Sequence, residues 1–143
     1  MEALGRTINT IAIADGVYIN MRDGGGVAFD CYLAAAAGDT YTLTEAKTAA
    51  GGSSQVLATI TQYYTCTGDG TDTWTKRTQA AASTVVTAAA ATENCAYFEI
   101  HGVELSDSFD YVKVASTGAG IVIAILHDLT VQRKPSNLAA IGV

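Results

Sequence analysis

Two aspartates flank a glycine turn at Asp69-Gly70-Thr71-Asp72, and carboxylates at this spacing are the raw material of a calcium-binding loop. An EF-hand loop also needs a third ligand at its fifth position and a bidentate glutamate at its twelfth. Counted from Asp69, these positions hold Thr73 and Ala80. We therefore interpret the segment as the loop of a β-hairpin and expect no metal site.

The two histidines and three cysteines also lack a catalytic pattern. His101 and His127 each end or follow an apolar run, where a hydrogen-bonded structural histidine is common. Cys31, Cys66 and Cys95 form no CxxC pair and have no histidine at metal-ligand spacing, so we interpret them as free, buried thiols of a protein made in a reducing cytosol. No GxSxG-type motif is present. We expect no enzymatic activity and no cofactor.

The aromatic residues Trp74, Tyr63 and Tyr64 are candidates for a binding surface. Side chains of this kind stack on sugars or anchor protein interfaces. All three lie in strand-like runs, so packing in the core is the simpler interpretation. If any of them faces outward, a protein interface and a glycan-binding surface both remain open.

The composition excludes some classes of partner. Of the 143 residues only 15% are charged, and the net charge is -6 with eight Lys and Arg in all. Binding to the phosphates of nucleic acid needs a cationic face, so we expect no nucleic-acid partner. The N-terminus shows no signal pattern, and the longest apolar run, Ile121 to Leu126, is too short to span a bilayer. We expect no membrane partner.

Short runs rich in β-branched and aromatic residues recur along the chain, bounded by Gly, Asp and Ser, and this pattern is typical of strands. The spacing predicts an all-β fold, an antiparallel β-sandwich of jelly-roll character, with a single domain over residues 1–143. Alternation is clearest where Tyr41, Leu43 and Glu45 interleave with threonines. The predicted strands cover residues 8–13, 17–21, 27–33, 40–44, 56–64, 74–78, 84–87, 96–101, 108–114 and 121–126. Predicted turns include residues 23–26, 68–70 and 118–120.

The late strands and the chain ends give two further predictions. We expect the centre of the core to be formed by Phe98, Ile100, Val112, Val114, Ile123 and Ile125. Extended terminal segments, about residues 1–6 and 133–143, carry apolar side chains beside a few cations, and we expect them to join subunits to one another or to a larger assembly. Their interface candidates are Leu4, Arg6, Arg133, Lys134, Leu138, Ile141 and Val143.

Two stretches of the sequence resemble a known family. The first is Asp39-Thr40-Tyr41-Thr42-Leu43-Thr44-Glu45-Ala46, followed by residues 49–52, 55–64 and 73–76. The second, residues 103–114 with 118–126, looks like a closing hairpin. Together they cover residues 39–128 and resemble the small capsid decoration (cement) proteins of tailed bacteriophages.

The resemblance implies a virion protein, made in the host cytoplasm, that coats the exterior of a phage head built from an HK97-type shell protein. It implies the major capsid protein and further copies of the chain as partners. A trimer would match the local three-folds of such a shell. Two alternatives stay open: a tail-tube or other tail structural protein, and a carbohydrate-binding, lectin-like sandwich that uses Trp74, Tyr63 or Tyr64.

Overall fold

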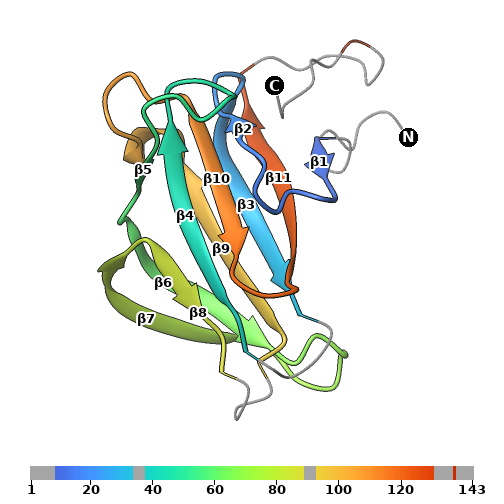
Figure 1. The fold of residues 1–143 in the computed structure, drawn as a ribbon. Helices are drawn as coiled ribbons and strands as arrows, with labels where there is room; N and C mark the ends of the chain where they lie inside the picture. The colour runs from blue at the N-terminus through green and yellow to red at the C-terminus, as the bar shows by residue number, and fades with distance from the viewer. Residues whose placement is uncertain (1–8, 34–37, 89–92, 131–136, 138–143) are drawn as a thin grey trace.

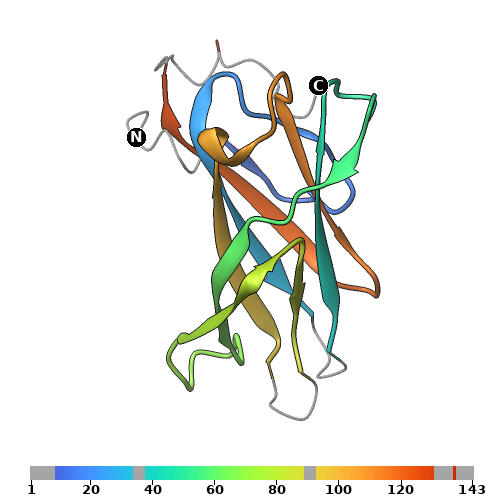
Figure 2. The ribbon, with the colours of Figure 1, turned by 90° about the vertical axis from the view of Figure 1, so that its left-hand side faces the viewer.

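The computed structural model describes residues 9–33, 38–88, 93–130 and 137, and in them two antiparallel sheets pack face to face (Figures 1 and 2). The larger sheet runs in the order β1 (Thr10–Ile11), β11 (Ile121–Leu129), β3 (Gly24–Tyr32), β9 (Cys95–His101), β6 (Ile60–Cys66) and β7 (Thr75–Ala82). The smaller runs β2 (Ile19–Asn20), β10 (Tyr111–Ser116), β4 (Thr40–Ala46) and β5 (Gln55–Val56), and β8 (Thr84–Val86) also pairs with β4. One 3-10 turn, η2 (Gly102–Glu104), follows β9.

The predicted β-sandwich is therefore confirmed, and every predicted strand has a counterpart in the structure. The run at residues 56–64 is divided between the sheets, because β5 pairs with β4 and β6 pairs with β7 and β9. The alanine runs at residues 34–37 and 89–91 lie outside the described residues.

The last three strands do not form a meander, and the expected closing hairpin is wrong. β9 and β11 belong to the larger sheet, whereas β10, between them in sequence, belongs to the smaller one. The turn after β10 is bound to the start of β4, where the Thr117 N–H donates to the Thr40 carbonyl oxygen at 3.0 Å. The chain then enters the other sheet at Ile121. β10 and β11 thus face each other across the core.

The core fills the space between the two inner faces. Phe29 of β3 and Phe98 of β9 lie side by side, with ring centroids 5.5 Å apart. Tyr41 and Leu43 of β4 are fully buried, as their alternation with threonines predicts. The predictions that placed Phe98, Ile100, Val112 and Val114 in the core are also confirmed.

The prediction that Ile123 and Ile125 are central core residues is wrong. Both are half-buried on the outer face of β11, and the inner face carries Val122, Ala124 and Leu126. The strand register explains which side of β11 faces the core, since Ala124 lies opposite Phe29. Beside the Phe29 and Phe98 rings the core has room for the methyl group of an alanine, so the larger isoleucines point outward.

The predicted turn at residues 23–26 is also corrected, because Gly24 already begins β3. A Cβ atom on Gly26 would lie 2.4 Å from Cε1 of His127, and one on Gly24 would lie 2.7 Å from Cγ of Leu126. These glycines therefore allow β3 to pack closely against β11, and they do not form a turn that reverses the chain.

Candidate functional site

The structure separates the aromatic residues that the sequence singled out. Tyr63 on β6 is half-buried and packs against the core, as the simpler interpretation expected. Tyr64, the next residue, and Trp74, just before β7, face outward and are exposed. The terminal candidates Leu4, Arg6, Arg133, Lys134, Leu138, Ile141 and Val143 lie outside the described residues.

Trp74 and Tyr64 meet a third aromatic side chain on the outer face of the larger sheet. Tyr97 of β9 lies directly opposite Tyr64 in the strand register, and its ring stands nearly edge-on to the Trp74 ring at a centroid distance of 6.3 Å. The three side chains line one shallow, almost wholly apolar pocket. Sequence reasoning missed Tyr97, although its alternation with Phe98 and Ile100 already placed it on the outer face.

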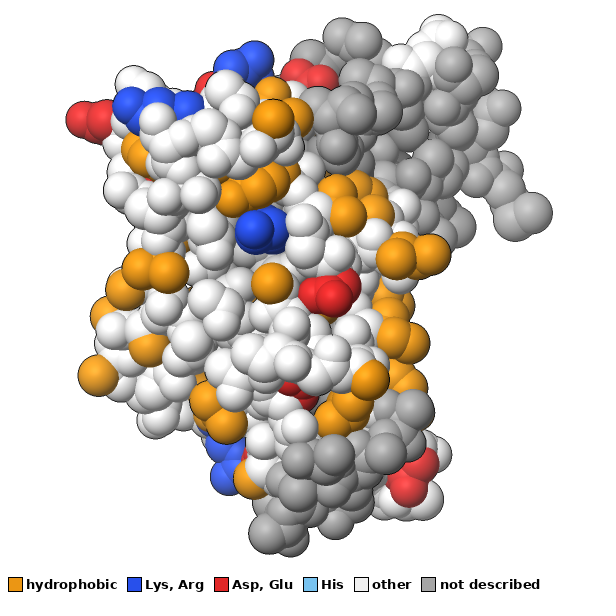
Figure 3. All heavy atoms as spheres, viewed as in Figure 1, with side chains coloured by type: hydrophobic (Ala, Val, Ile, Leu, Met, Phe, Trp, Pro, Cys, Tyr) orange, Lys and Arg blue, Asp and Glu red, His pale blue; other side chains and the backbone are white. Residues whose placement is uncertain are grey.

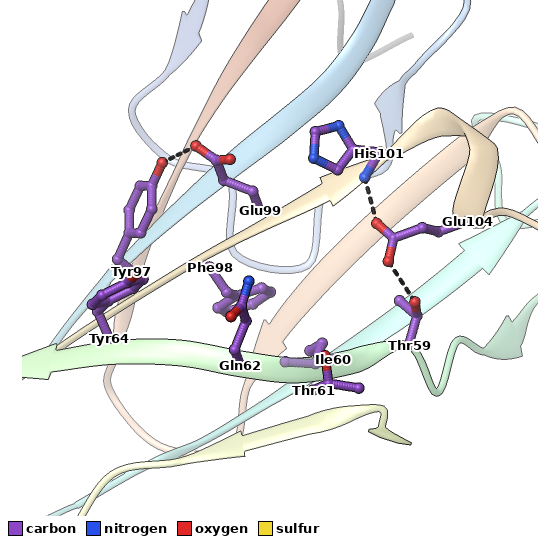
Figure 4. Close-up of a pocket in the computed structure, with 10 residues that line it drawn as sticks. All are labelled: Thr59, Ile60, Thr61, Gln62, Tyr64, Tyr97, Phe98, Glu99, His101 and Glu104. Atoms are coloured by element: carbon purple, nitrogen blue, oxygen red, sulfur yellow. Dashed lines mark hydrogen bonds between the residues drawn. The ribbon is translucent and has the colours of Figure 1, made fainter. Parts of the chain in front are cut away.

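A polar cleft adjoins this aromatic pocket where two strands part. β6 and β9 pair from Cys66 to Tyr64, and beyond this point β6 continues with β7 and β9 with β3. The gap that opens is about 380 Å³ in volume (Figure 4). It is lined by Thr59, Ile60, Thr61, Gln62, Tyr64, Tyr97, Phe98, Glu99, His101 and Glu104.

A carboxylate lies at each end of the cleft. Glu104 accepts hydrogen bonds from the Thr59 hydroxyl at 2.6 Å and from the His101 backbone N–H at 2.7 Å, so it ties η2 to the segment before β6. At the other end the Tyr97 hydroxyl donates to Glu99. Figure 4 shows Gln62 between these ends, on β6. The cleft therefore offers a carboxylate, an amide and hydroxyl groups around an apolar floor.

A second feature of the same sheet is the apolar outer face of β11. Ile121, Ile123 and Ile125 alternate along it, and Ile121 retains 47% of its surface exposed beside Tyr32 of β3. Figure 3 shows hydrophobic side chains along the edge where β11 lies. From Ile121 to Leu126, β11 is thus apolar on both faces.

The loop that resembled a calcium site is confirmed as a hairpin loop between β6 and β7. Asp69 accepts hydrogen bonds from the backbone and hydroxyl of Thr71 and from the Thr67 hydroxyl, and these bonds lower its pKa to about 2. Asp72 accepts from the Thr67 backbone N–H at 3.0 Å. Within the described part of the chain, no three His, Cys, Asp or Glu side chains cluster as metal ligands would.

His127 is a buried structural histidine, 5% exposed. Its Nδ1 lies 2.7 Å from Oδ2 of Asp128, but its buried Nε2 finds no hydrogen-bond partner among the described residues. Within this part of the chain, the expectation of a hydrogen-bonded histidine therefore holds for one ring nitrogen only. The exposed His101 ring stands edge-on to it at a centroid distance of 5.8 Å.

The three cysteines are free in the structure. Cys31 and Cys95 are buried, and Cys66 is only partly so. Burial raises the pKa of the Cys31 thiol well above its usual value, and burial together with the neighbouring Cys66 raises that of Cys95 to about 12. Deprotonation of these two thiols is therefore disfavoured at neutral pH.

Comparison of the chain with protein-family models, with curated proteins and with solved structures finds no match. Among the described residues no helix is long and apolar enough to cross a membrane. The candidate binding surfaces are therefore the aromatic pocket with its adjoining cleft and the outer face of β11, both on the larger sheet.

Proposed function

We propose that this protein is a structural component of a tailed-phage virion that decorates and stabilises the outer surface of an HK97-type capsid. The observation that carries the proposal is the apolar outer face of β11, with Ile121, Ile123 and Ile125. Antiparallel sheets that face water normally alternate apolar and polar residues, whereas a strand that is apolar on both faces is normally covered on both. A protein partner supplies such a cover.

The surroundings of this face fit a protein interface. Tyr32 lies opposite Ile121, and aromatic residues are enriched at the centres of interfaces, from which charged residues are depleted. The charged neighbour of Ile123 on β3 is Asp30, and burial raises the pKa of its carboxyl. Covering the exposed half of one isoleucine contributes about 1 kcal/mol, so several such contacts together are needed for stable attachment.

The proposed partners are the major capsid protein and further copies of this chain, with a trimer as the expected oligomer on a shell with local three-folds. The proposal also includes a jelly-roll character for the β-sandwich and a position of the protein on the capsid exterior. The protein acts by binding and not by catalysis. Electron microscopy of virions separates this role from a tail role, because a decoration protein lies on the head and a tail-tube subunit stacks in rings.

Ile121→Asp tests the attachment surface, and Val86→Asp is its matched control. Val86 is also an exposed aliphatic residue, 55% exposed, but it lies on β8 of the other sheet. Both variants should melt like the wild type. In co-sedimentation with undecorated shells, Ile121→Asp should lose binding and Val86→Asp should keep it. Equal binding by both variants would overturn the assignment of this face.

A further inference from the structure

The aromatic pocket and the cleft between β6 and β9 form one continuous surface, since both are lined by Tyr64 and Tyr97. We propose that this two-part surface is a binding site for a neutral saccharide. One sugar ring packs in the pocket formed by Trp74, Tyr64 and Tyr97, and the hydroxyl groups of the adjoining sugar are held in the cleft. The proposal does not depend on a virion role.

The shape of the aromatic pocket fits a sugar ring. The Trp74 and Tyr97 rings meet at an interplanar angle of 66°, so they form a corner and not a flat plate. A pyranose presents C–H groups on its faces and hydroxyls around its rim, and aromatic rings bind such C–H faces by hydrophobic and dispersion contact. Trp74 is 47% exposed, and a ring seated there would cover it.

The cleft supplies the polar half of the site. A sugar hydroxyl both donates and accepts hydrogen bonds, and the Gln62 amide, the Thr61 hydroxyl and the Glu99 carboxylate together offer both functions. Glu104 is already bonded to Thr59 and the His101 backbone, so it forms the wall of the cleft. The volume of about 380 Å³ lies within the range of small-molecule sites, about 300–1,000 Å³.

The charges of the cleft select the class of saccharide. None of the ten described residues that line it is Lys or Arg, whereas Glu99 and Glu104 are both acidic. An acidic sugar would meet like charge there, and like charges in a partly enclosed site repel. A neutral ligand avoids this cost. The site lies on the same outer face as the isoleucines of β11, with the single strand β3 between β9 and β11.

Fluorescence of Trp74, the single tryptophan of the chain, provides a direct test on the purified protein. The probes are two neutral tetrasaccharides, chitotetraose and maltotetraose, and one acidic tetrasaccharide, tetragalacturonate. At least one neutral probe should change the emission in a saturable manner at millimolar concentrations, and the acidic probe should not. Absence of any response to both neutral probes would overturn the proposal, as would equal or tighter binding of the acidic one.

Variants measured by titration calorimetry assign the binding to this surface. Trp74→Ala and Gln62→Ala should each weaken binding of the neutral probe by about tenfold or more. The control Tyr32→Ala removes an exposed tyrosine of the same sheet that lines neither pocket nor cleft, and it should leave affinity unchanged. Unchanged affinity in Trp74→Ala would refute the site. Ile121→Asp should bind the probe like the wild type whatever its behaviour toward capsids. Failure of the saccharide proposal can therefore be distinguished from failure of the capsid proposal.

Discussion

Asp39 is a buried carboxylate that binds the turn between β10 and β11, and its replacement by Asn gives a sharp test of the fold. It lies just before β4, is 6% exposed, and accepts hydrogen bonds from the turn between β10 and β11. Its Oδ1 accepts from the N–H groups of Thr40 at 2.7 Å, Thr117 at 3.1 Å and Gly118 at 3.0 Å, and from the Thr117 hydroxyl at 2.9 Å. Its Oδ2 accepts from the Ser116 hydroxyl.

These contacts determine how the carboxylate titrates. Burial by itself raises the pKa of Asp39, but the hydrogen bonds from Ser116, Thr117, Thr40 and Gly118 outweigh burial, and the pKa lies below its usual value of 3.8. A carboxylate with a lowered pKa in the folded state stabilises the protein above its unfolded pKa. Its contribution is lost as the pH falls below 3.8 and through the folded pKa.

The size of the effect follows from the number of donors. A hydrogen bond to a charged group contributes about 1.5–3 kcal/mol and a neutral one about 0.5–1.5 kcal/mol. Asp39→Asn removes the charge from five such bonds and turns an amide N–H toward the Ser116 hydroxyl. Because the bonds share one carboxylate and the turn is partly exposed, we expect a loss of about 2–4 kcal/mol at neutral pH.

Urea unfolding at a series of pH values measures this loss. The difference in free energy of unfolding between wild type and Asp39→Asn should be largest at pH 7 and should shrink as the pH falls below 4. Asp107→Asn, at an exposed loop position, should match the wild type throughout. A difference below about 0.5 kcal/mol at pH 7, or one that does not change with pH, would refute the reasoning.

Three further predictions concern β11, β3 and the thiols. Leu126→Ala, in the core, should lower the free energy of urea unfolding by about 2–5 kcal/mol, and Ile123→Ala, on the outer face, by clearly less; equal losses would contradict the register. Gly26→Ala should lower the melting temperature, because its Cβ would lie 2.4 Å from the His127 ring, at a cost of about 1–3 kcal/mol; unchanged melting would contradict this contact. Iodoacetamide followed by mass spectrometry should label Cys66 in the folded protein and the other two cysteines only after unfolding, and uniform labelling would show that their burial is wrong.

The sequence determined the strands and most of their inward faces. The β-branched and aromatic runs between turn-forming residues are local signals, and each strand that they predicted is present. In β4 the alternation of Tyr41 and Leu43 with threonines also indicated which side chains are buried. Such a pattern needs no knowledge of the neighbouring strands, because successive side chains of a strand always point to opposite faces.

The candidate saccharide site was only partly accessible from the sequence. Trp74 and Tyr64 were recognised as possible stacking residues, but Tyr97 joins them from a strand that is distant in the chain. The cleft beside them exists because β6 and β9 part after Tyr64. The divergence of two strands depends on their other neighbours, and residue types within either strand carry no signal for it.

The faces of β11 were decided by the tertiary structure alone. Residues 121–126 are all apolar, so the run contains no period of two that would identify an inner side. The pairing with β3 sets Ala124 opposite Phe29, and the close packing of the aromatic core leaves space there for a small side chain only. A local sequence pattern thus specified that this segment is a strand, whereas the volume available between the two sheets specified that its isoleucines face outward.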